Sequence, residues 1–185
     1  MRIVGGTFKG RTLAAPSDQS TRPTSDRVRE AMFNILSHGI DGLTPDGARV
    51  MDLFAGTGAL GLEALSRGAR FCQFVDEGTE ARGLVRRNAD ALGVIGQVKI
   101  WRRDATKLGP CAPQTPFDLV FCDPPYGKGL GEGALASLVE GQWLSSGAVV
   151  VLEEKADAQV SDVAGLTLID TRIYGDTQVR FYRAD

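Results

Sequence analysis

The chain has 185 residues, of which 43% are hydrophobic and 24% are charged, the proportions of an ordinary globular protein. This length is enough for one large domain with a full hydrophobic core. No apolar run approaches the ~20 residues that a membrane-spanning helix needs. Residues 1–15 alternate polar and apolar side chains, unlike a signal peptide. We therefore expect a cytoplasmic protein without a membrane span.

The three cysteines and the single histidine offer little material for metal or histidine chemistry. Cys72, Cys111 and Cys122 are widely spaced and form no C-x-x-C pair, so they fit neither a disulfide framework nor a zinc site. Cys72 and Cys122 lie in strand-like runs, where cysteine acts as a small buried apolar residue. His38 ends a helical pattern, and we expect it at the surface or in a cap. No metal site is predicted.

The net charge of −2 is unevenly distributed along the chain. The first 24 residues carry Arg2, Lys9, Arg11 and Arg22 against Asp18, a net charge of +3, so the remainder sums to −5. A basic segment on an acidic body indicates an anionic partner for that segment. A merely solvated terminus would have a similar composition, and this alternative stays open.

We divide the chain into a basic N-terminal head, residues 1–23, and a larger domain, residues 24–185. The head is predicted to form a small hairpin, with strand-like pieces at 2–4 and 11–13 around the Gly5-Gly6 turn. A helix is expected to follow, capped by Ser25 or Asp26 and ended by Gly39. Its buried face would carry Val28, Met32, Ile35 and Leu36, and its opposite face Arg27, Arg29 and Glu30.

From residue 49 onward, predicted strands and helices alternate. Apolar runs predict strands at 50–54, 71–75, 97–101, 117–122 and 148–153, and helical patterns fall at 58–67, 79–92 and 134–140. This order predicts an α/β fold with a doubly wound, mostly parallel sheet and right-handed crossovers. Two final strands, 166–172 and 178–182, have no helix between them and predict an antiparallel hairpin at the edge of the seven-stranded sheet.

A glycine motif follows the first strand of this pattern. Gly56, Gly58 and Gly61 spell G-x-G-x-x-G, which lets the backbone approach a ligand at the start of a helix. A plain tight turn would have the same glycines. The motif alone therefore predicts a nucleotide-like cofactor only weakly.

Acidic residues stand at the ends of four successive predicted strands: Asp52, Asp76, Asp104 and Asp123. Ligands of open parallel sheets lie beyond these carboxyl ends. Asp76 lies twenty residues after Gly56, the distance at which an acid bonds ribose hydroxyls, and Asp104 would accept from an adenine amine. Both features suit NAD and S-adenosylmethionine alike. Asp52 favours the latter, because a carboxylate suits a cationic amino acid tail and would repel a pyrophosphate.

The tetrapeptide Asp123-Pro124-Pro125-Tyr126 indicates the chemistry. An exocyclic amine on a base is a poor nucleophile because its lone pair is delocalised into the ring. The Asp123 carboxylate and the Pro124 carbonyl, accepting its two hydrogens, would draw the nitrogen toward tetrahedral geometry. The adjacent prolines would hold that carbonyl outward, and Tyr126 would stack on an extruded base. A double-proline turn after a strand is the structural alternative.

Residues 49–68 and 117–126 resemble the class I S-adenosylmethionine-dependent methyltransferases, and Asp123-Pro124-Pro125-Tyr126 resembles the D/N-P-P-Y/F signature of those that methylate amino nitrogens. More narrowly, the chain up to Tyr126 resembles the RsmD family of small-subunit ribosomal RNA guanine-N2 methyltransferases. The matching motifs are Arg2-Ile3-Val4-Gly5-Gly6 with Lys9-Gly10-Arg11, then Arg22-Pro23-Thr24, Asp26-Arg27-Val28-Arg29-Glu30, Phe33-Asn34, and residues 59–69. Lys9 stands where an arginine is usual, and Thr57 replaces a frequent serine.

The resemblance and the strand-end pattern together imply a monomeric enzyme that methylates the N2 amine of a guanine in ribosomal RNA. The expected cofactor residues are Asp52, Phe54, Ala55, Gly56, Thr57, Gly58, Asp76, Glu77, Asp104, Ala105 and Asp123. The expected catalytic residues are Asp123, Pro124, Pro125 and Tyr126, and the expected RNA-binding residues are Arg2, Lys9, Arg11, Arg22 and Lys128.

Three alternatives remain open. An adenine-N6 DNA methyltransferase would use the same Asp-Pro-Pro-Tyr motif, although this chain leaves no room for a target-recognition domain. An NAD-dependent dehydrogenase would use the glycine motif, but Asp52 and the missing substrate domain argue against this alternative. A non-catalytic RNA-binding module would not need the acidic strand ends.

Overall fold

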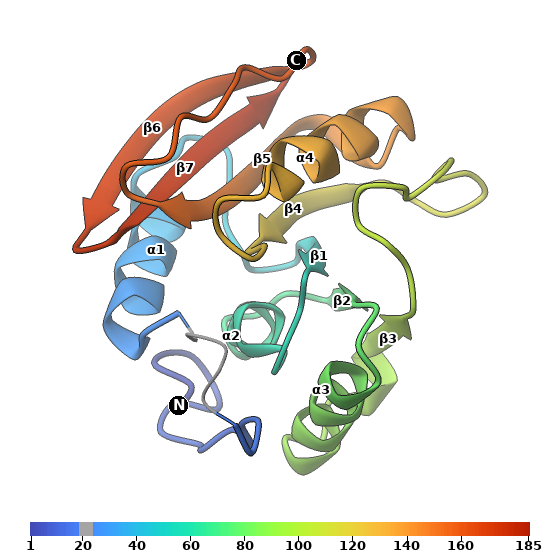
Figure 1. Cartoon of the computed structure of the whole chain (residues 1–185). Coiled ribbons are helices and arrows are strands. Elements are labelled where there is room, and N and C mark those ends of the chain that lie inside the picture. Colours follow the sequence, from blue (N-terminus) through green and yellow to red (C-terminus); the bar gives the residue numbers. More distant parts are fainter. Residues whose placement is uncertain (19–23) are drawn as a thin grey trace.

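The computed structural model describes residues 1–18 and 24–185. Its central element is a twisted sheet of seven strands (Figure 1). Its strand order is β3-β2-β1-β4-β5-β7-β6. Strands β1 to β5 pair in parallel, and β7 pairs antiparallel with both β5 and β6. The strands are β1 (Arg49–Leu53), β2 (Phe71–Val75), β3 (Val98–Trp101), β4 (Phe117–Cys122), β5 (Leu144–Lys155), β6 (Leu166–Tyr174) and β7 (Thr177–Ala184).

This topology confirms the predicted mostly parallel α/β sheet with an antiparallel pair at its edge. The direction in which strands are added to the sheet reverses after β3, because β4 pairs with the free side of β1, opposite β2. Ligands of open α/β sheets bind at this kind of switch point.

Two hydrophobic cores cover the two faces of the sheet, because successive strand residues point to opposite faces. Val50, Phe74 and Phe121 pack with the helices α1, α2 and α3 on one face. Met51 and Val120 pack with α4 on the other, together with the helix-free segment 102–116. The helices are α1 (Asp26–His38), α2 (Ala59–Ser66), α3 (Thr79–Ala91) and α4 (Leu130–Glu140), and a short 3₁₀ helix covers Ile95–Gln97.

The first helix has the predicted boundaries. The Ser25 hydroxyl accepts from the Val28 N–H as the N-cap, and Gly39 is the C-cap. Met32 and Leu36 are buried as predicted.

Arg29, however, is fully buried, and the prediction that it lies on the exposed face of α1 is wrong. Its guanidinium contacts the Arg2 carbonyl, donates to Thr24 O at 3.2 Å and to Asp26 Oδ1 at 2.8 Å, and lies 3.5 Å from the Glu63 carboxylate. The N-terminal segment and α2 cover this side of the helix, a tertiary arrangement that helical periodicity does not reveal.

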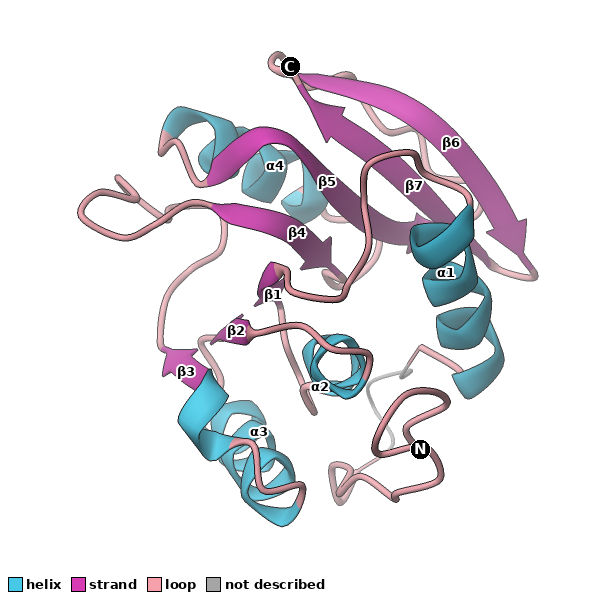
Figure 2. Cartoon of the chain, turned by 180° about the vertical axis from the view of Figure 1, so that it is seen from behind, coloured by secondary structure: helices cyan, strands magenta, loops and turns pink. Residues whose placement is uncertain are grey.

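Residues 1–14 form the hairpin that their sequence predicts, in the reduced form of a single antiparallel bridge between Arg2 and Thr12. Ile3 N–H donates to Arg11 O at 3.0 Å, and Gly10 N–H donates to Ile3 O at 2.8 Å. Ile3 and Leu13 are buried in the core that α1 shares with α2. Figure 2 shows this segment beside α1 and α2.

The buried carboxylate of Glu63 on α2 holds the turn of this hairpin. It accepts Val4 N–H at 3.0 Å and Gly5 N–H at 2.9 Å, and it forms ion pairs with Arg29 and Arg67. Hydrogen bonds to a charged group contribute ~1.5–3 kcal/mol each. The turn of the hairpin is therefore attached to α2 by its backbone N–H groups rather than by its basic side chains.

All three cysteines are free and buried, and Cys72 and Cys122 lie in β2 and β4, as predicted for small apolar strand residues. Within residues 1–18 and 24–185, no helix combines the length and apolar character required to cross a bilayer.

Candidate active site

The loop that follows β1 has an unusual backbone. Phe54, Gly56 and Gly58 have positive φ angles of 55°, 58° and 82°. A side chain at Gly56 would meet nothing nearer than 4.0 Å, whereas one at Gly61 would come within 2.4 Å of Phe74. Gly56 and Gly58 therefore shape the loop, and Gly61 allows α2 to pack closely on β2.

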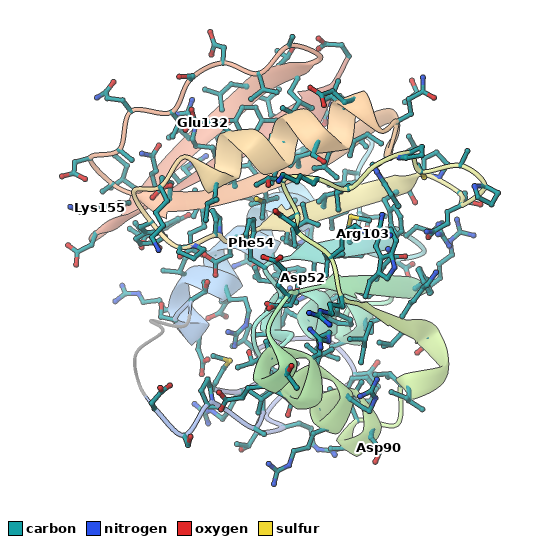
Figure 3. The ribbon with its side chains drawn as sticks, turned by 45° about the vertical axis from the view of Figure 1, so that its right-hand side comes forward. Asp52, Phe54, Asp90, Arg103, Glu132 and Lys155 are labelled. Carbon is teal, nitrogen blue, oxygen red and sulfur yellow. The ribbon has the colours of Figure 1, made fainter. Side chains whose placement is uncertain are left out.

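Asp52 lies beneath this loop with only 1% of its surface exposed (Figure 3). Its Oδ2 accepts the Gly61 N–H at 3.0 Å. Burial, with a further contribution from the nearby Asp76 charge, raises the pKa of the Asp52 carboxyl to about 8, against the opposing effect of the Gly61 hydrogen bond. A cation placed against this group would be strongly favoured.

Asp76 connects the end of β2 to the same loop. Its Oδ2 accepts the Gly56 N–H at 3.0 Å, and its Oδ1 accepts the Gly78 N–H at 2.8 Å. The carboxylate therefore braces the glycine loop from the neighbouring strand, as well as standing where the ribose is expected.

Asp104 follows β3 and accepts two hydrogen bonds from Thr106, from its N–H at 2.9 Å and its hydroxyl at 2.7 Å. These bonds lower the pKa of the Asp104 carboxyl. The remaining expected cofactor residues differ in exposure: Ala55, Thr57 and Ala105 are buried, and Glu77 is exposed.

The Asp-Pro-Pro-Tyr motif begins directly beside the glycine loop. Leu53 of β1 pairs with Cys122 of β4, so Phe54 and Asp123 are the residues that follow a paired position on adjacent strands. Pro124 is buried and Pro125 is exposed. The structure therefore brings the predicted cofactor loop and the predicted catalytic motif together at one edge of the sheet.

Three residues that the sequence analysis missed surround this motif. Thr24 Oγ1 lies 3.1 Å from Asp123 Oδ2 and 2.6 Å from Glu153 Oε2. The Tyr126 hydroxyl donates to Glu153 Oε1 at 2.6 Å and lies 3.2 Å from Thr177 Oγ1. Glu153 therefore links both ends of the motif through hydrogen bonds.

Glu153 could have been found from the sequence. It ends the predicted strand 148–153, so it is the fifth acidic residue at a strand end. Thr24 and Thr177 carry no such signal, because only the packing of α1 and β7 brings them here.

The carboxyl groups around the motif influence one another. Burial and the neighbouring Glu153 carboxylate raise the pKa of Asp123 well above its usual range, although the Thr24 hydroxyl opposes this shift. Burial and the hydrogen bond to Glu153 also raise the pKa of Tyr126. Tyr126 is therefore a neutral donor at physiological pH.

A cleft of about 550 Å³ opens next to the motif, between the start of α1 and the β6–β7 turn. Its lining includes Thr24, Ser25, Tyr126, Glu153, Tyr174 and Thr177. A cleft of this size is within the range of small-ligand sites. Across the described parts of the chain, no group of three or more histidine, cysteine, aspartate or glutamate side chains is arranged to hold a metal ion.

The expected RNA-binding residues are not gathered in one place. The Arg2 guanidinium is 68% exposed and lies 3.9 Å from Asp26, and Arg11 donates to the Ala91 carbonyl at 2.7 Å. Lys9 is exposed on the hairpin, and Lys128 is exposed in the loop after Tyr126. Arg22 lies outside the described residues.

The hairpin extends away from the glycine loop along α2. Near the loop, the Thr57 hydroxyl contacts Met1 Sδ at 3.4 Å, while Thr7 N–H donates to Ser66 O at the far end of α2. Lys9 and Arg11 belong to this far part of the hairpin, whereas Lys128 adjoins the catalytic motif.

Comparison with known proteins gives a consistent assignment. The model of the family described as "Conserved hypothetical protein 95" matches residues 1–183. Ribosomal RNA small subunit methyltransferase D of Escherichia coli K12 is 33% identical over 186 residues, covering 100% of this chain and 90% of that protein. The enzyme of the same name from Haemophilus influenzae is 31% identical over 185 residues, covering 99% of this chain and 93% of that protein.

The solved structure of the Escherichia coli protein yhhF has a TM-score of 0.84 to this chain at 32% identity, covering 100% of this chain and 98% of that one. The methyltransferase homologues exclude the dehydrogenase alternative. The chain is a class I methyltransferase and belongs to the RsmD family.

Proposed function

We propose that this methyltransferase transfers a methyl group from S-adenosylmethionine to the exocyclic N2 amine of a guanine in small-subunit ribosomal RNA. The observation that carries the proposal is the register of β1 and β4, which sets Asp123-Pro124-Pro125-Tyr126 beside the glycine loop. A cofactor on that loop would lie against a motif suited to an amine substrate.

The residues at this edge of the sheet fit the cofactor. Positive φ angles at Phe54, Gly56 and Gly58 give the loop the shape needed for close backbone approach. Asp76 would hold the ribose, Asp104 the adenine amine, and the buried Asp52 the ammonium group of the amino acid tail. When bound, S-adenosylmethionine supplies a methyl group on a sulfonium cation.

Asp123 and Pro124 would act on the amine. The Asp123 carboxylate and the Pro124 carbonyl accept its two N–H groups, which moves the nitrogen lone pair out of conjugation with the ring. These interactions strengthen as the nitrogen becomes tetrahedral, so they favour the transition state over the ground state. Tyr126 offers its ring to the base, while its hydroxyl is fixed by Glu153.

Ribosomal RNA as the substrate is supported by the names of the relatives and by the exposed cations. The Escherichia coli and Haemophilus influenzae relatives are named as methyltransferases of small-subunit ribosomal RNA. Lys128 lies beside the motif, and Arg2, Lys9 and Arg11 lie on the hairpin, where each can contact a phosphate.

The test is methyl transfer in vitro with S-adenosylmethionine labelled in its methyl group. The purified protein is incubated separately with naked small-subunit ribosomal RNA, assembled small subunits and double-stranded DNA, and each product is digested to nucleosides. The proposal predicts label in N2-methylguanosine from an RNA-containing substrate. Label in N6-methyldeoxyadenosine would instead assign the DNA adenine activity, and no label in any nucleoside would refute the proposal.

A further inference from the structure

Glu153 is a carboxylate of the cleft to which the proposed reaction assigns no contact with the substrate. It lies in β5 at the carboxyl edge of the sheet, lines the cleft beside Tyr126, and is only 4% exposed. Among residues 1–18 and 24–185, no lysine or arginine forms an ion pair with it. A buried acid without a cation is costly, so its retention at this place calls for a chemical reason.

The hydrogen bonds of Glu153 leave part of its accepting capacity available. Its two oxygens accept one hydroxyl each, from Thr24 at 2.6 Å and from Tyr126 at 2.6 Å. A carboxylate offers about four lone-pair positions. Both hydroxyl donors fix the carboxylate in place and leave it able to accept from a ligand in the cleft.

Glu153 is also linked by hydrogen bonds to the first residue of the catalytic motif. One hydroxyl, that of Thr24, lies within hydrogen-bond distance of both Asp123 Oδ2 and Glu153 Oε2. The two carboxyl groups are therefore neighbours joined by one hydroxyl, and Glu153 lines the cleft beside them. A planar ligand with two adjacent N–H donors on one edge matches such a pair of acceptors.

Guanine has this edge, because its N1–H and its N2 amine are adjacent donors. Adenine presents an unprotonated N1 at the corresponding place, and a carboxylate would repel that lone pair. We propose, on the basis of the proposed function, that Glu153 accepts the guanine N1–H while Asp123 accepts the N2 amine, so that Glu153 determines specificity for guanine. Extruded bases are commonly read by hydrogen bonds to this edge.

A substrate that keeps the N2 amine but lacks the N1 proton gives the sharpest test. The methylated position is first mapped on the ribosomal RNA substrate with the wild-type protein. RNA is then assembled by ligation with either guanosine or 2-aminopurine riboside at that position. 2-Aminopurine keeps the N2 amine but lacks the N1 proton and the O6 atom. Initial rates of N2 methylation are compared for the wild type, Glu153→Gln and Tyr126→Phe.

The wild type is expected to methylate guanosine roughly 10- to 100-fold faster than 2-aminopurine, the range for one charge-assisted hydrogen bond. Glu153→Gln keeps the shape of the side chain but can donate to an unprotonated N1. It should therefore bring the guanosine to 2-aminopurine rate ratio at least tenfold closer to one. Tyr126→Phe removes a hydroxyl partner of Glu153 and leaves the carboxylate, so it should slow both substrates and preserve the ratio.

Each other outcome contradicts the inference in a recognisable way. If Glu153→Gln slows both substrates equally, as Tyr126→Phe does, Glu153 only positions the motif. If it leaves both rates unchanged, Glu153 has no part in recognition. Thermal unfolding and cofactor affinity of each variant identify a loss caused by misfolding, in which case Glu153→Asp replaces Glu153→Gln and should retain the wild-type preference. If the wild-type protein methylates no guanine at all, it is the proposed function that fails.

Discussion

Cofactor binding should release one proton from Asp52, and replacing Asp52 with asparagine should abolish this release. Burial raises the pKa of Asp52 to about 8, so this carboxyl group is mostly protonated in the free protein at pH 6 to 7. The groups that face it are the Gly61 N–H from α2, the thiols of Cys72 and Cys122, and the carboxyl groups of Asp76 and Asp123. None is a cation, so an incoming ammonium group would supply the first positive charge beside it.

The magnitude follows from this pKa. Below it, each pH unit changes the affinity for a ligand that requires the ionised form by up to about tenfold. Between pH 5.5 and 7.5 the cofactor affinity of the wild type should increase roughly 30- to 100-fold. An α-amino group has a pKa of about 7.7–8.0, so the cofactor remains largely cationic over this range. The amide introduced by Asp52→Asn would still accept the Gly61 N–H but cannot ionise, so this variant should bind weakly and with nearly constant affinity.

Isothermal titration calorimetry in two buffers of different ionisation enthalpy measures the affinity and the protons released. The wild type should release close to one proton at pH 6.5, and Asp52→Asn close to none. A wild-type affinity that stays flat across this range, or an equal slope in Asp52→Asn, would refute the placement of the ammonium group.

In the absence of cofactor, the raised pKa of Asp52 means that the folded protein loses stability as pH rises from about 4 toward 8. Asp52→Asn should therefore unfold at a higher temperature than the wild type at pH 8.

Four further predictions concern the cofactor loop, the motif and the hairpin. Asp76→Ala should weaken cofactor binding by about 1.5–3 kcal/mol for each charge-assisted hydrogen bond lost, and Asp76→Asn should bind more nearly as the wild type does. An unchanged calorimetric affinity in Asp76→Ala would contradict the ribose assignment. Asp123→Ala should leave cofactor affinity largely intact while kcat falls steeply, and Asp123→Asn should retain more activity; wild-type turnover in Asp123→Ala would show that the amine is activated elsewhere. Because the Asp123 pKa is raised, wild-type turnover should increase with pH through that pKa, whereas Asp123→Asn should lack this step. Replacing both Lys9 and Arg11 with glutamate should reduce RNA affinity and lower the salt slope of RNA binding by roughly one unit per lost phosphate contact. Cofactor affinity should stay the same. An unchanged salt slope would show that the hairpin has only a structural role.

The sheet was predictable because its signals are local. Apolar runs and turn residues marked each strand, and the acidic residues at the strand ends required only the rule that parallel strands share a carboxyl edge. The β1–β4 register then brought Asp52, the glycine loop and Asp123 to one place, as expected.

The residues that escaped prediction act through long-range packing. Arg29 has the spacing of an exposed helix residue, and only the N-terminal segment and Glu63 of α2 make its position buried and charged. Thr24 meets Glu153 across 129 positions of sequence, a contact that no periodicity encodes. The end of the predicted strand indicates Glu153, but no pattern in the sequence indicates that Thr24 is its partner.

The central claim is that this chain makes N2-methylguanosine in small-subunit ribosomal RNA, and modification mapping in cells tests it most directly. Small-subunit ribosomal RNA is isolated from the parent strain, from a strain lacking this gene, and from that strain carrying the wild-type or the Asp123→Ala protein. Quantitative mass spectrometry of the nucleosides should show the loss of one N2-methylguanosine on deletion, its return with the wild type, and little or no return with Asp123→Ala. An unchanged N2-methylguanosine content after deletion, together with the loss of a different methylated nucleoside, would contradict the account.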